Sequence, residues 1–466
     1  MNKICRKWTS LFLLLLFTCC GNSMAAAPTG SNGAQTVLGL DELVRMALER
    51  SPELKQAEMD VQSARSDLQQ AKAGQWAQMD VTAIAGPVPN ADEPYVKVNS
   101  KGIGYLQNDE GGIGIFGKLE INIVQPLYTF GKISNRQDAA ASGVAVQKAG
   151  KEKKRGDVML NVKELYFGLI AANQGKGAAE DADTFLRDAQ DRIKRLISLG
   201  STNVDQSDLY RLEAYRAEIE QFKYKADSGA RMAYLALKTA VGMPPGKDFV
   251  LDARELPREP ILLASQEEYV RNALARRPEL DQLRKGIDAQ KSMVEASQAD
   301  LYPSLFLAAI GSFAGAPGRE HLAGFYIRDE FNHADAGLVL GAQWHFDLGI
   351  GKGKVNKALA EYQKLMHTKE YAEQNIPLEV AKYYQDAEDA RISFESYKKS
   401  ATASRKWVVA AFSNFDMGVG TARDMFDAID RYGKNQGEYL LSLYNYHLAL
   451  ARLSHAAAEY LTGSKG

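Results

Sequence analysis

The chain has 466 residues, of which 57 are basic and 58 acidic, so its formal net charge at pH 7 is −1. This balance leaves no basic domain of the kind that binds nucleic acid, and we expect no nucleic-acid partner. The three cysteines are Cys5, Cys19 and Cys20, so the rest of the chain has no disulfide, no thiol chemistry and no cysteine-based metal site.

Residues 1–25 have the pattern of a secretory signal peptide. A positively charged start is followed by an apolar run over 11–17 and by small residues up to Ala25. The run is too short to cross a bilayer as a helix. Cys19 and Cys20 leave open a lipid-modified N-terminus. Beyond this leader no apolar stretch reaches about 18 residues, which excludes helical spans but not short alternating strands.

An internal duplication is the most informative feature of the chain. VRMALERSPELKQ, starting at Val44, returns as VRNALARRPELDQ, starting at Val270. A similar order of helical, apolar and glycine-rich segments follows each copy. The period of about 220 residues is too long for a solenoid repeat. We therefore divide the chain into a first repeat with its linker (26–264) and a second repeat (265–466).

In the first repeat, periodicity and turn residues predict both helices and strands. In the segment 119–124, Leu119, Ile121 and Ile123 alternate with polar residues, which predicts a strand between two environments. The stretch 131–199 would be roughly 100 Å long as a helix, a length typical of coiled coils. In chain order we predict helices over 40–50 and 52–77, a strand over 79–85, a loop over 86–117, a strand over 119–124, and helices over 131–199 and 204–241.

The second repeat is predicted to have the same order. Its long helix carries aromatic and small residues at alternating spacings of four and three, which is the coiled-coil period. Pro377 is expected to bend it. In the first repeat the helix before the strand and the last helix together match the long one in length, so two shorter helices could lie end to end beside it. The predicted elements are helices over 269–277 and 278–301, strands over 304–313 and 338–346 around a loop over 315–336, and helices over 355–417 and 421–461.

This duplicated order, behind a secretory leader, resembles the TolC-like outer-membrane efflux factor family over essentially the whole mature chain. Three motifs carry the resemblance. They are the RPEL start at 277–280 (SPEL at 51–54), the helix-to-strand junction ADLYPS at 299–304, and the strand-to-helix junction QPLYTFGK at 125–132. Each motif alone is weak, but their order and duplication are specific.

The resemblance implies a mostly helical fold with a β-barrel part. Each chain of a homotrimer would give four strands to a shared 12-stranded transmembrane barrel, and the helices would form a periplasmic tunnel. The implied partners are a periplasmic adaptor protein, an inner-membrane pump and outer-membrane lipid. Physical reasoning adds that four strands cannot close a barrel and that open edges are not tolerated in lipid. The chain must therefore self-associate, although the residues alone do not separate two copies from three.

The segment 420–428, which opens the last helix, is the best candidate site. It resembles the family's aperture segment, where two aspartates three residues apart line the closed periplasmic entrance. Asp424 and Asp427 share a helix face, so three copies would place a ring of carboxylates around one axis, which attracts cations. The family often has an arginine where Gly420 stands, and Arg423 is the nearest arginine here. The alternative is that these aspartates are helix-start charges favoured by the dipole.

The turn of the first repeat should be the companion tip. Gly200, Asn203 and Asp205, with Gly418 of the second repeat, resemble the region that meets the adaptor. Asp205 is equally well explained as a helix-start charge.

Other candidate residues carry no decisive chemistry. We find no nucleophile–base pairing and no ligand spacing among the histidines, so we expect no catalytic residue, metal or cofactor and no enzyme. His345 is expected to point from its strand into the lumen as a lone polar residue. Trp76, Tyr302 and Trp344 belong either to an aromatic girdle or to ordinary packing.

The sequence thus predicts a passive exit duct, located in the outer membrane with a long periplasmic extension. It would serve a tripartite efflux pump or a type I secretion system. The rival interpretation is a structural coiled-coil protein or adhesin of the periplasm or cell surface. The residues leave the cargo open, as well as the pump and adaptor.

Overall fold

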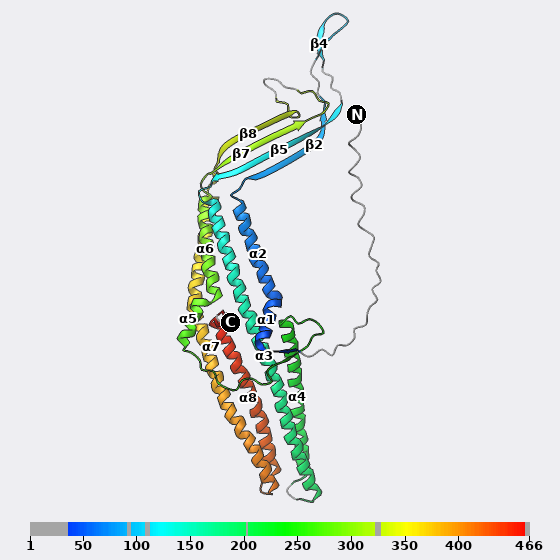
Figure 1. The fold of residues 1–466 in the computed structure, drawn as a ribbon, viewed down its shortest axis with the longest axis vertical. Coiled ribbons are helices and arrows are strands. Elements are labelled where there is room, and N and C mark those ends of the chain that lie inside the picture. Colours follow the sequence, from blue (N-terminus) through cyan, green and yellow to red (C-terminus); the bar gives the residue numbers. More distant parts are fainter. Residues whose placement is uncertain (1–35, 91–94, 108–111, 202–203, 322–327, 462–466) are drawn as a thin grey trace.

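The computed structural model describes residues 36–90, 95–107, 112–201, 204–321 and 328–461. The expected signal peptide, with Cys19 and Cys20, lies outside these ranges. The described chain is elongated, with long helices below and strands above (Figure 1). None of the helices in the described ranges combines the length and the apolar composition that a membrane crossing needs.

The helices of the two repeats match in length. α1 and α5 have 11 residues each, α2 and α6 have 22, α3 and α7 have 67, and α4 and α8 have 35. This equality supports the tandem duplication. The bounds are α1 Leu40–Arg50, α2 Pro52–Ala73, α3 Lys132–Ser198, α4 Gln206–Ala240, α5 Gln266–Arg276, α6 Pro278–Ala299, α7 Ile350–Asp416 and α8 Ala422–Ala456, followed by a 3₁₀ turn, η1 Glu459–Leu461.

A four-stranded antiparallel sheet joins the repeats in the order β2-β5-β7-β8. The central pair, β5 with β7, brings one strand from each repeat together, and β2 and β8 are the edges. Their bounds are β2 Gln78–Pro89, β5 Ile113–Tyr128, β7 Ser304–Gly315 and β8 His333–Gln343. Two smaller sheets pair β3 (Tyr95–Val98) with β4 (Gly104–Gln107), antiparallel, and β1 (Thr36–Leu38) with β6 (Phe249–Leu251), parallel.

The register of the sheet confirms the predicted division of its faces. Directly paired residues share a face, and faces alternate along each strand. Ile121 pairs with Gly311, Ile123 with Ala309, and Leu340 with Leu307, so all three predicted lipid-side residues lie on one face. The predicted water-side residues Glu120, Asn122 and Gln343 lie on the other face.

Several predicted boundaries were wrong. The expected loop 86–117 contains the ends of β2 and β5 and the β3–β4 hairpin. β8 ends at Gln343, so His345 lies after the strand and its expected strand position was wrong. The cause is a turn into α7, where Asp347 accepts hydrogen bonds from the backbone N–H groups of Gly349 (3.0 Å) and Gly351 (2.9 Å). α7 continues through Pro377, beside the buried Ile376 and Val380, and the bend expected there stays a prediction.

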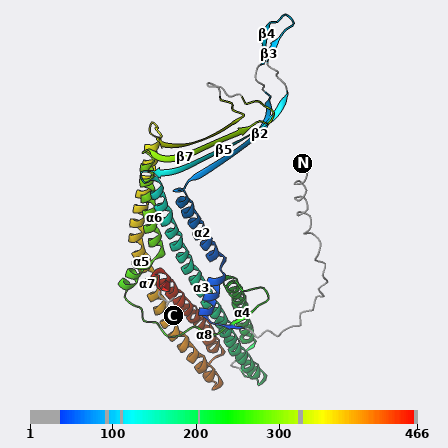
Figure 2. The same cartoon turned by 45° about the horizontal axis from the view of Figure 1, so that its top comes forward.

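The helices form a wall one layer thick. Next to the sheet the helices touch in the order α2, α3, α6, α7, and farther away in the order α4, α3, α8, α7. Figures 1 and 2 both show the shorter helices stacked along the long ones, which confirms the predicted arrangement. α7 lies at one edge of every row, and α2 or α4 at the other. These edges continue the edges of the sheet, because α2 leads into β2 and β8 leads into α7.

The segment between the repeats is hydrogen-bonded to α8 of this wall. The Tyr446 hydroxyl accepts a hydrogen bond from the Ile261 N–H (2.8 Å), and the His447 ring nitrogen Nε2 lies 2.9 Å from the carbonyl of Pro257. Burial lowers the pKa of His447, so the ring is neutral at ordinary pH and Nε2–H can donate to that carbonyl. The segment therefore belongs to the body of the fold.

Candidate functional site

Two connecting turns between helices form the end of the molecule farthest from the sheet (Figure 1). One joins α3 to α4 and the other joins α7 to α8. The helices that meet here share one hydrophobic core, in which Leu186 of α3, Leu212 of α4, Val408 of α7 and Phe426 of α8 are buried together. The two tips are therefore held as a unit.

The predicted glycines end the two long helices. Gly200 and Gly418 have φ values of +73° and +75°, a backbone conformation that residues with a side chain rarely adopt. The Gly200 N–H donates to the carbonyl of Ile197 (3.0 Å), and the next N–H reaches back to the carbonyl of Leu196 (3.0 Å). Gly418 repeats this arrangement, in which a left-handed residue satisfies the last helical carbonyls. Both glycines thus allow the chain to end a long helix and turn at the tip.

A reciprocal cap begins α8. The Thr421 N–H and hydroxyl both donate to Oδ2 of Asp424, at 3.1 and 2.7 Å, and the Asp424 N–H donates to the Thr421 hydroxyl at 3.1 Å. This is a capping box, which satisfies the otherwise unpaired N–H groups of the first turn. The bond from the Thr421 hydroxyl is the main cause that lowers the pKa of Asp424. Asp424 therefore does act as a helix-start residue.

The first repeat begins α4 in the same way. Oδ1 of Asp205 accepts from the N–H groups of Ser207 (2.7 Å) and Asp208 (3.2 Å), and Asp208 accepts from the Asp205 N–H (3.3 Å). Hydrogen bonding, first from the Ser207 hydroxyl, lowers the pKa of Asp205. The helix-start explanation thus holds for Asp205 too. Asn203 lies outside the described residues.

Asp427 differs from Asp424 in its surroundings. Its side chain is 54% exposed, and its nearest cation is Arg423, with Nε 4.0 Å from Oδ2. Arg423, Asp424 and Asp427 all lie on the solvent side of α8, whereas Met425 and Phe426 between them are buried. The three predicted aperture residues therefore share one exposed face. At that distance and exposure the ion pair is weak, so the Asp427 carboxylate is available to solvent cations.

The corresponding place in the first repeat has the opposite charge. Six residues after the cap, where α8 has Asp427, α4 has Arg211, whose Nη1 lies 3.8 Å from Asp208. An exposed acidic face is therefore a property of the second tip.

Sequence reasoning missed two features of the tips. One is a group of exposed apolar side chains, Leu199, Met417 and Val419, which are 80%, 68% and 77% exposed. Their position beside the turn glycines was a signal for a contact surface. Arg192 of α3 also forms an ion pair with Asp416 at the end of α7, and its guanidinium lies 4.9 Å from the centre of the Phe412 ring. No local pattern marks this link, because its residues come from different repeats.

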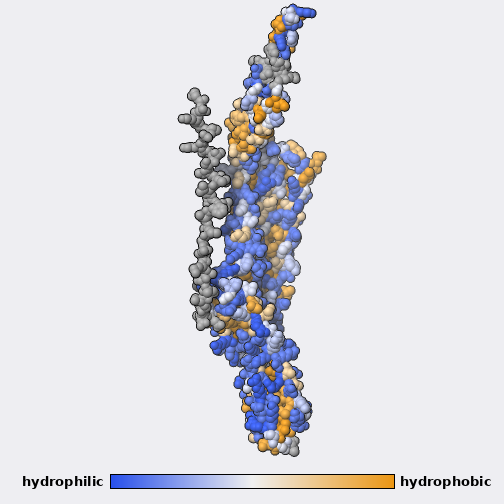
Figure 3. Space-filling model, turned by 90° about the vertical axis from the view of Figure 1, so that its right-hand side faces the viewer, coloured by the Kyte–Doolittle hydropathy of each residue, from blue (hydrophilic) through white to orange (hydrophobic). Residues whose placement is uncertain are grey.

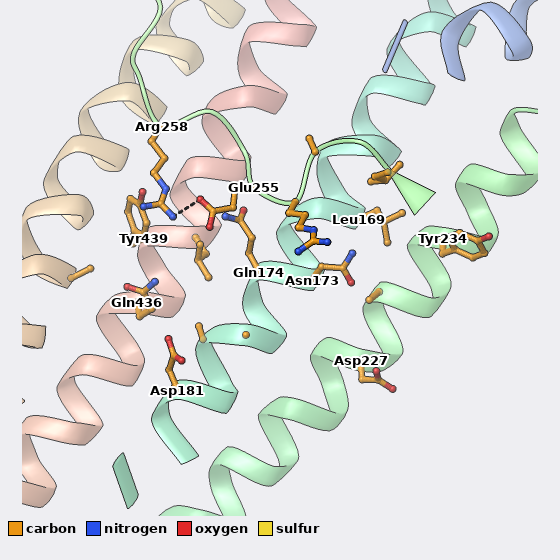
Figure 4. A pocket seen from close by; sticks show the side chains of 18 of the residues that line it. Leu169, Asn173, Gln174, Asp181, Asp227, Tyr234, Glu255, Arg258, Gln436 and Tyr439 are labelled. Carbon is orange, nitrogen blue, oxygen red and sulfur yellow. Dashed lines mark hydrogen bonds and ion pairs between the residues drawn. The ribbon is translucent and has the colours of Figure 1, made fainter. Parts of the chain in front are cut away.

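A cavity of about 1150 Å³ lies higher in the wall, between α3, α4, α7, α8 and the segment between the repeats (Figure 4). Polar side chains such as Asn173, Gln436 and Asp181 line it, and Arg258 pairs with Glu255 at 2.6 Å. These groups come from helices and from the segment between the repeats, and they form no nucleophile–base arrangement.

The aromatic residues predicted at the sheet–helix junction lie there. Trp76, Tyr302 and Trp344 are 66%, 54% and 53% exposed. Tyr302 also stacks on Phe130 with ring centres 5.4 Å apart, and the Trp344 indole N–H donates to the carbonyl of Leu301 at 3.0 Å. Tyr302 and Trp344 are thus about half exposed and also contact neighbouring residues.

Comparisons with solved structures show the same fold in bacterial membrane proteins. A membrane protein from Pseudomonas aeruginosa has a TM-score of 0.70 at 16% identity, over 93% of this chain and all of that one. VceC from Vibrio cholerae has a TM-score of 0.71 at 19% identity, over 90% and 95%. The open-state MtrE channel of Neisseria gonorrhoeae has a TM-score of 0.71 at 17% identity, over 90% and 88%. Among curated protein sequences, none matches this chain.

A family model also matches the sequence directly, in two blocks. The model describes outer membrane efflux proteins, and it matches residues 43–242 and 269–459, which is most of the chain. The two blocks follow the two copies of the duplicated motif. This protein is thus a member of the outer membrane efflux protein family, and its location is the outer membrane.

Proposed function

We propose that the protein is the passive exit duct of a tripartite efflux pump or of a type I secretion system. The observation that supports this most is the continuity of sheet and wall. A sheet with one apolar and one mixed polar face passes directly into a single layer of long helices with the same two edges. Such a surface encloses a continuous path only when several copies complete it. The proposed energy source is an inner-membrane pump.

The proposed assembly is a homotrimer. β2 and β8 are each paired on only one side within the described sheet, and unpaired strand edges are not tolerated in lipid. The helices at the edges carry exposed apolar side chains. On α4, Tyr210, Tyr224 and Leu235 are 64%, 70% and 55% exposed, and on α7, Leu378 and Ile392 are 69% and 53% exposed. Figure 3 shows hydrophobic residues over the strands and along the lower helices on one face.

These surfaces favour contact between α7 and β8 of one copy and α4 and β2 of the next. Three copies would supply the twelve strands that the family resemblance implies. The apolar face with Ile121 and Leu340 would meet lipid, and the face with Glu120 and Asn122 would line the water-filled lumen.

At the far end, we assign the aperture to Asp424, Asp427 and Arg423. Three copies of this exposed face would surround the axis with carboxylates, which favours cations over anions. The proposed adaptor contact comprises Gly200, Asn203, Asp205 and Gly418. Leu199, Met417 and Val419 add an apolar surface there, as an interface with a partner protein needs.

The test combines a gel with a current measurement. Outer-membrane extracts should contain a form that migrates as a trimer without heating and as a monomer after boiling, and the purified trimer should carry ion current in planar bilayers. Introducing charge at the edge of the wall, with Leu378→Glu and Ile392→Glu together, should reduce the trimer strongly. Asn445→Glu is the control, because Asn445 is exposed on α8, which lies inside the wall between α3 and α7. Monomer alone in unheated extracts of the parent chain would refute the proposal and favour a simple coiled-coil protein.

A further inference from the structure

The duplication relates the strands of the two repeats residue by residue. β2 and β7 have 12 residues each. Their first residues, Gln78 and Ser304, are 226 positions apart, as are the first residues of α2 and α6. Gln78 pairs with Val124 in the first repeat, and Ser304 pairs with Gln343 in the second. Val124 of β5 therefore corresponds to Gln343 of β8.

One junction between repeats lies inside the chain. β5, the second strand of the first repeat, pairs with β7, the first strand of the second repeat, and next to the sheet α3 contacts α6. In a ring of copies a second junction joins β8, the second strand of a second repeat, to β2 of the next copy. Because the repeats are equivalent in their strands and helices, the register of the internal junction gives a register for the junction between copies.

This correspondence yields one register. Val124 pairs with Ala308 inside the chain, and these two residues correspond to Gln343 and Thr82. Gln343 of one copy would thus lie opposite Thr82 of the next, on the face with Glu120. The pairs that follow in steps of two along this face are Gly341 with Ile84 and Val339 with Gly86.

The glycines at the two edges give independent support, because each is covered by an aromatic ring. A Cβ added to Gly341 would lie 2.4 Å from the ring of Phe306, with which Gly341 pairs. A Cβ added to Gly86 would lie 3.3 Å from the ring of Phe116, its own pairing partner. An aromatic ring over an edge glycine is a stabilising arrangement in sheets. Each edge therefore presents a place without a side chain, beside a ring.

In the inferred register each of these glycines faces a branched side chain of the next copy. Ile84 and Val339 are both 47% exposed in a single copy. Ile84 would lie opposite Gly341, where it can contact the Phe306 ring across the glycine. Val339 would lie opposite Gly86 and contact the ring that covers it. Aromatic and β-branched side chains are favourable neighbours across strands. The two edges are thus complementary in size.

We propose that β8 pairs with β2 of the next copy in the register that sets Gln343 opposite Thr82. A shift of two residues would place Gly341 opposite Gly86 or Thr82 and lose this fit. A shift of one residue would turn lipid-side residues toward the lumen. Next to the sheet, α7 then lies against α2 of the next copy, as α3 lies against α6. This inference rests on the proposed trimer, and it specifies how the edges of two copies meet.

Cysteine pairs test the register in the assembled protein, since the chain has no cysteine after Cys20. Thr82→Cys with Gln343→Cys should form a disulfide on oxidation, because directly opposed Cβ atoms are about 4.5–5.5 Å apart. Asp80→Cys or Ile84→Cys, each with Gln343→Cys, are the matched controls, because diagonal neighbours are about 7–8 Å apart. The Thr82 pair should give at least about fivefold more linked chains on a denaturing gel without reductant.

A disulfide within one chain does not compete with this link. Thr82 lies in the same row of the sheet as Asp335, and Asp335 and Gln343 are eight positions apart along β8. At about 3.4 Å per residue, Thr82 and Gln343 of one copy are at least roughly 27 Å apart. A disulfide between these positions therefore joins two copies.

A second measurement tests the contact across Gly341. Ile84→Ala and Phe306→Ala should each lower the temperature at which the trimer dissociates. Together they should lower it by less than the sum of the two effects, because both remove the same contact. Ile84→Ala with Ile310→Ala is the control, and its effects should add, because Ile310 is four positions from Phe306 along β7.

The unheated gel separates the possible outcomes. A normal trimer in which the Thr82 pair links no better than the Asp80 or Ile84 pair overturns the register and leaves the proposed function standing. Additive effects of Ile84→Ala and Phe306→Ala overturn the contact across the glycine. Absence of a trimer in the parent chain overturns the proposed function and this inference together. A normal trimer with selective linking through Thr82 supports both.

Discussion

Asp424 and Asp427 are one helical turn apart, yet their surroundings give them different tasks. The Asp424 carboxylate accepts two hydrogen bonds from Thr421 and is built into the start of α8. The Asp427 carboxylate is 54% exposed, and among the described residues its ion-pair partner is Arg423. A cap and a cation-attracting group are compatible, because a capping carboxylate keeps its charge. Of the two, Asp427 is the cleaner probe of the aperture.

We therefore expect Asp427→Asn to weaken block by a trivalent cation added on the periplasmic side by at least about tenfold, since attraction scales with the product of the charges. The measurement is current through trimers in planar bilayers. Asp430→Asn serves as the control, because Asp430 lies on the same helix and is paired with Lys434 at 2.8 Å. Equal block in parent and Asp427→Asn would mean that Asp427 is not at the aperture.

The capping box gives a separate prediction. Thr421→Ala should weaken the start of α8 by about 1 kcal/mol, while Thr421→Ser should keep the cap. Faster hydrogen exchange at the N–H of Asp424, in the alanine variant only, would show this. No difference between the two variants would contradict the cap.

The lowered pKa of Asp424 sets the pH dependence of this cap. Bonds to a carboxylate with a lowered pKa stabilise the fold above the ordinary value of 3.8 and are lost as the pH falls below it. Protection of the first turn of α8 should therefore be constant near neutral pH and decrease only below pH 3.8. A decrease already near neutral pH would point to another group.

Among the elements, the helices could be predicted best from sequence. The 3.5-residue repeat of α7 and the glycine at 418 predicted a helix over 355–417. The observed helix, Ile350–Asp416, differs from it by only a few residues. The strands were harder, because β5 continues through Gly114, Gly117 and Pro126, which are local stop signals that sheet pairing overrides. The pairing of β1 with β6, like the ion pair of Arg192 with Asp416, joins distant residues and leaves no local pattern.

For the candidate site, the sequence supplied the residues but not their partners. The spacing of Asp424 and Asp427 placed both on one face of α8. It could not show that Asp424 would bond to Thr421, since a capping side chain depends on the backbone angles at the start of the helix.

The sheet gives a prediction at the scale of a strand. Ile121→Arg should reduce the heat-dissociable trimer in the outer membrane strongly, because an arginine on the lipid side costs about 2–4 kcal/mol at mid-membrane. Asn122→Arg, one residue away on the other face, should assemble nearly as well as the parent. Similar amounts of trimer for both variants would show that the face with Ile121 does not meet lipid.

At the scale of the whole molecule, the proposed topology puts the two ends of the molecule in different compartments. Short peptide tags inserted at Ser100, in the β3–β4 turn, and at Gly318, in the loop after β7, should be labelled on intact cells. A tag at Gly246, between the repeats, should be labelled only after lysis. All three sites are exposed turns, so insertion there should be tolerated. The reverse labelling pattern would invert the proposed topology.

The equal helix lengths of the two repeats also restrict how this protein can change during evolution. α3 and α7 have 67 residues each, and both end at the same level because their tips share a core. Each added residue would lengthen a helix by about 1.5 Å. A deletion in one long helix would move its tip away from the other, whereas the same deletion in both, repeated in α4 and α8, would keep the tips level. The reach of the molecule can therefore vary only through changes that occur in both halves together.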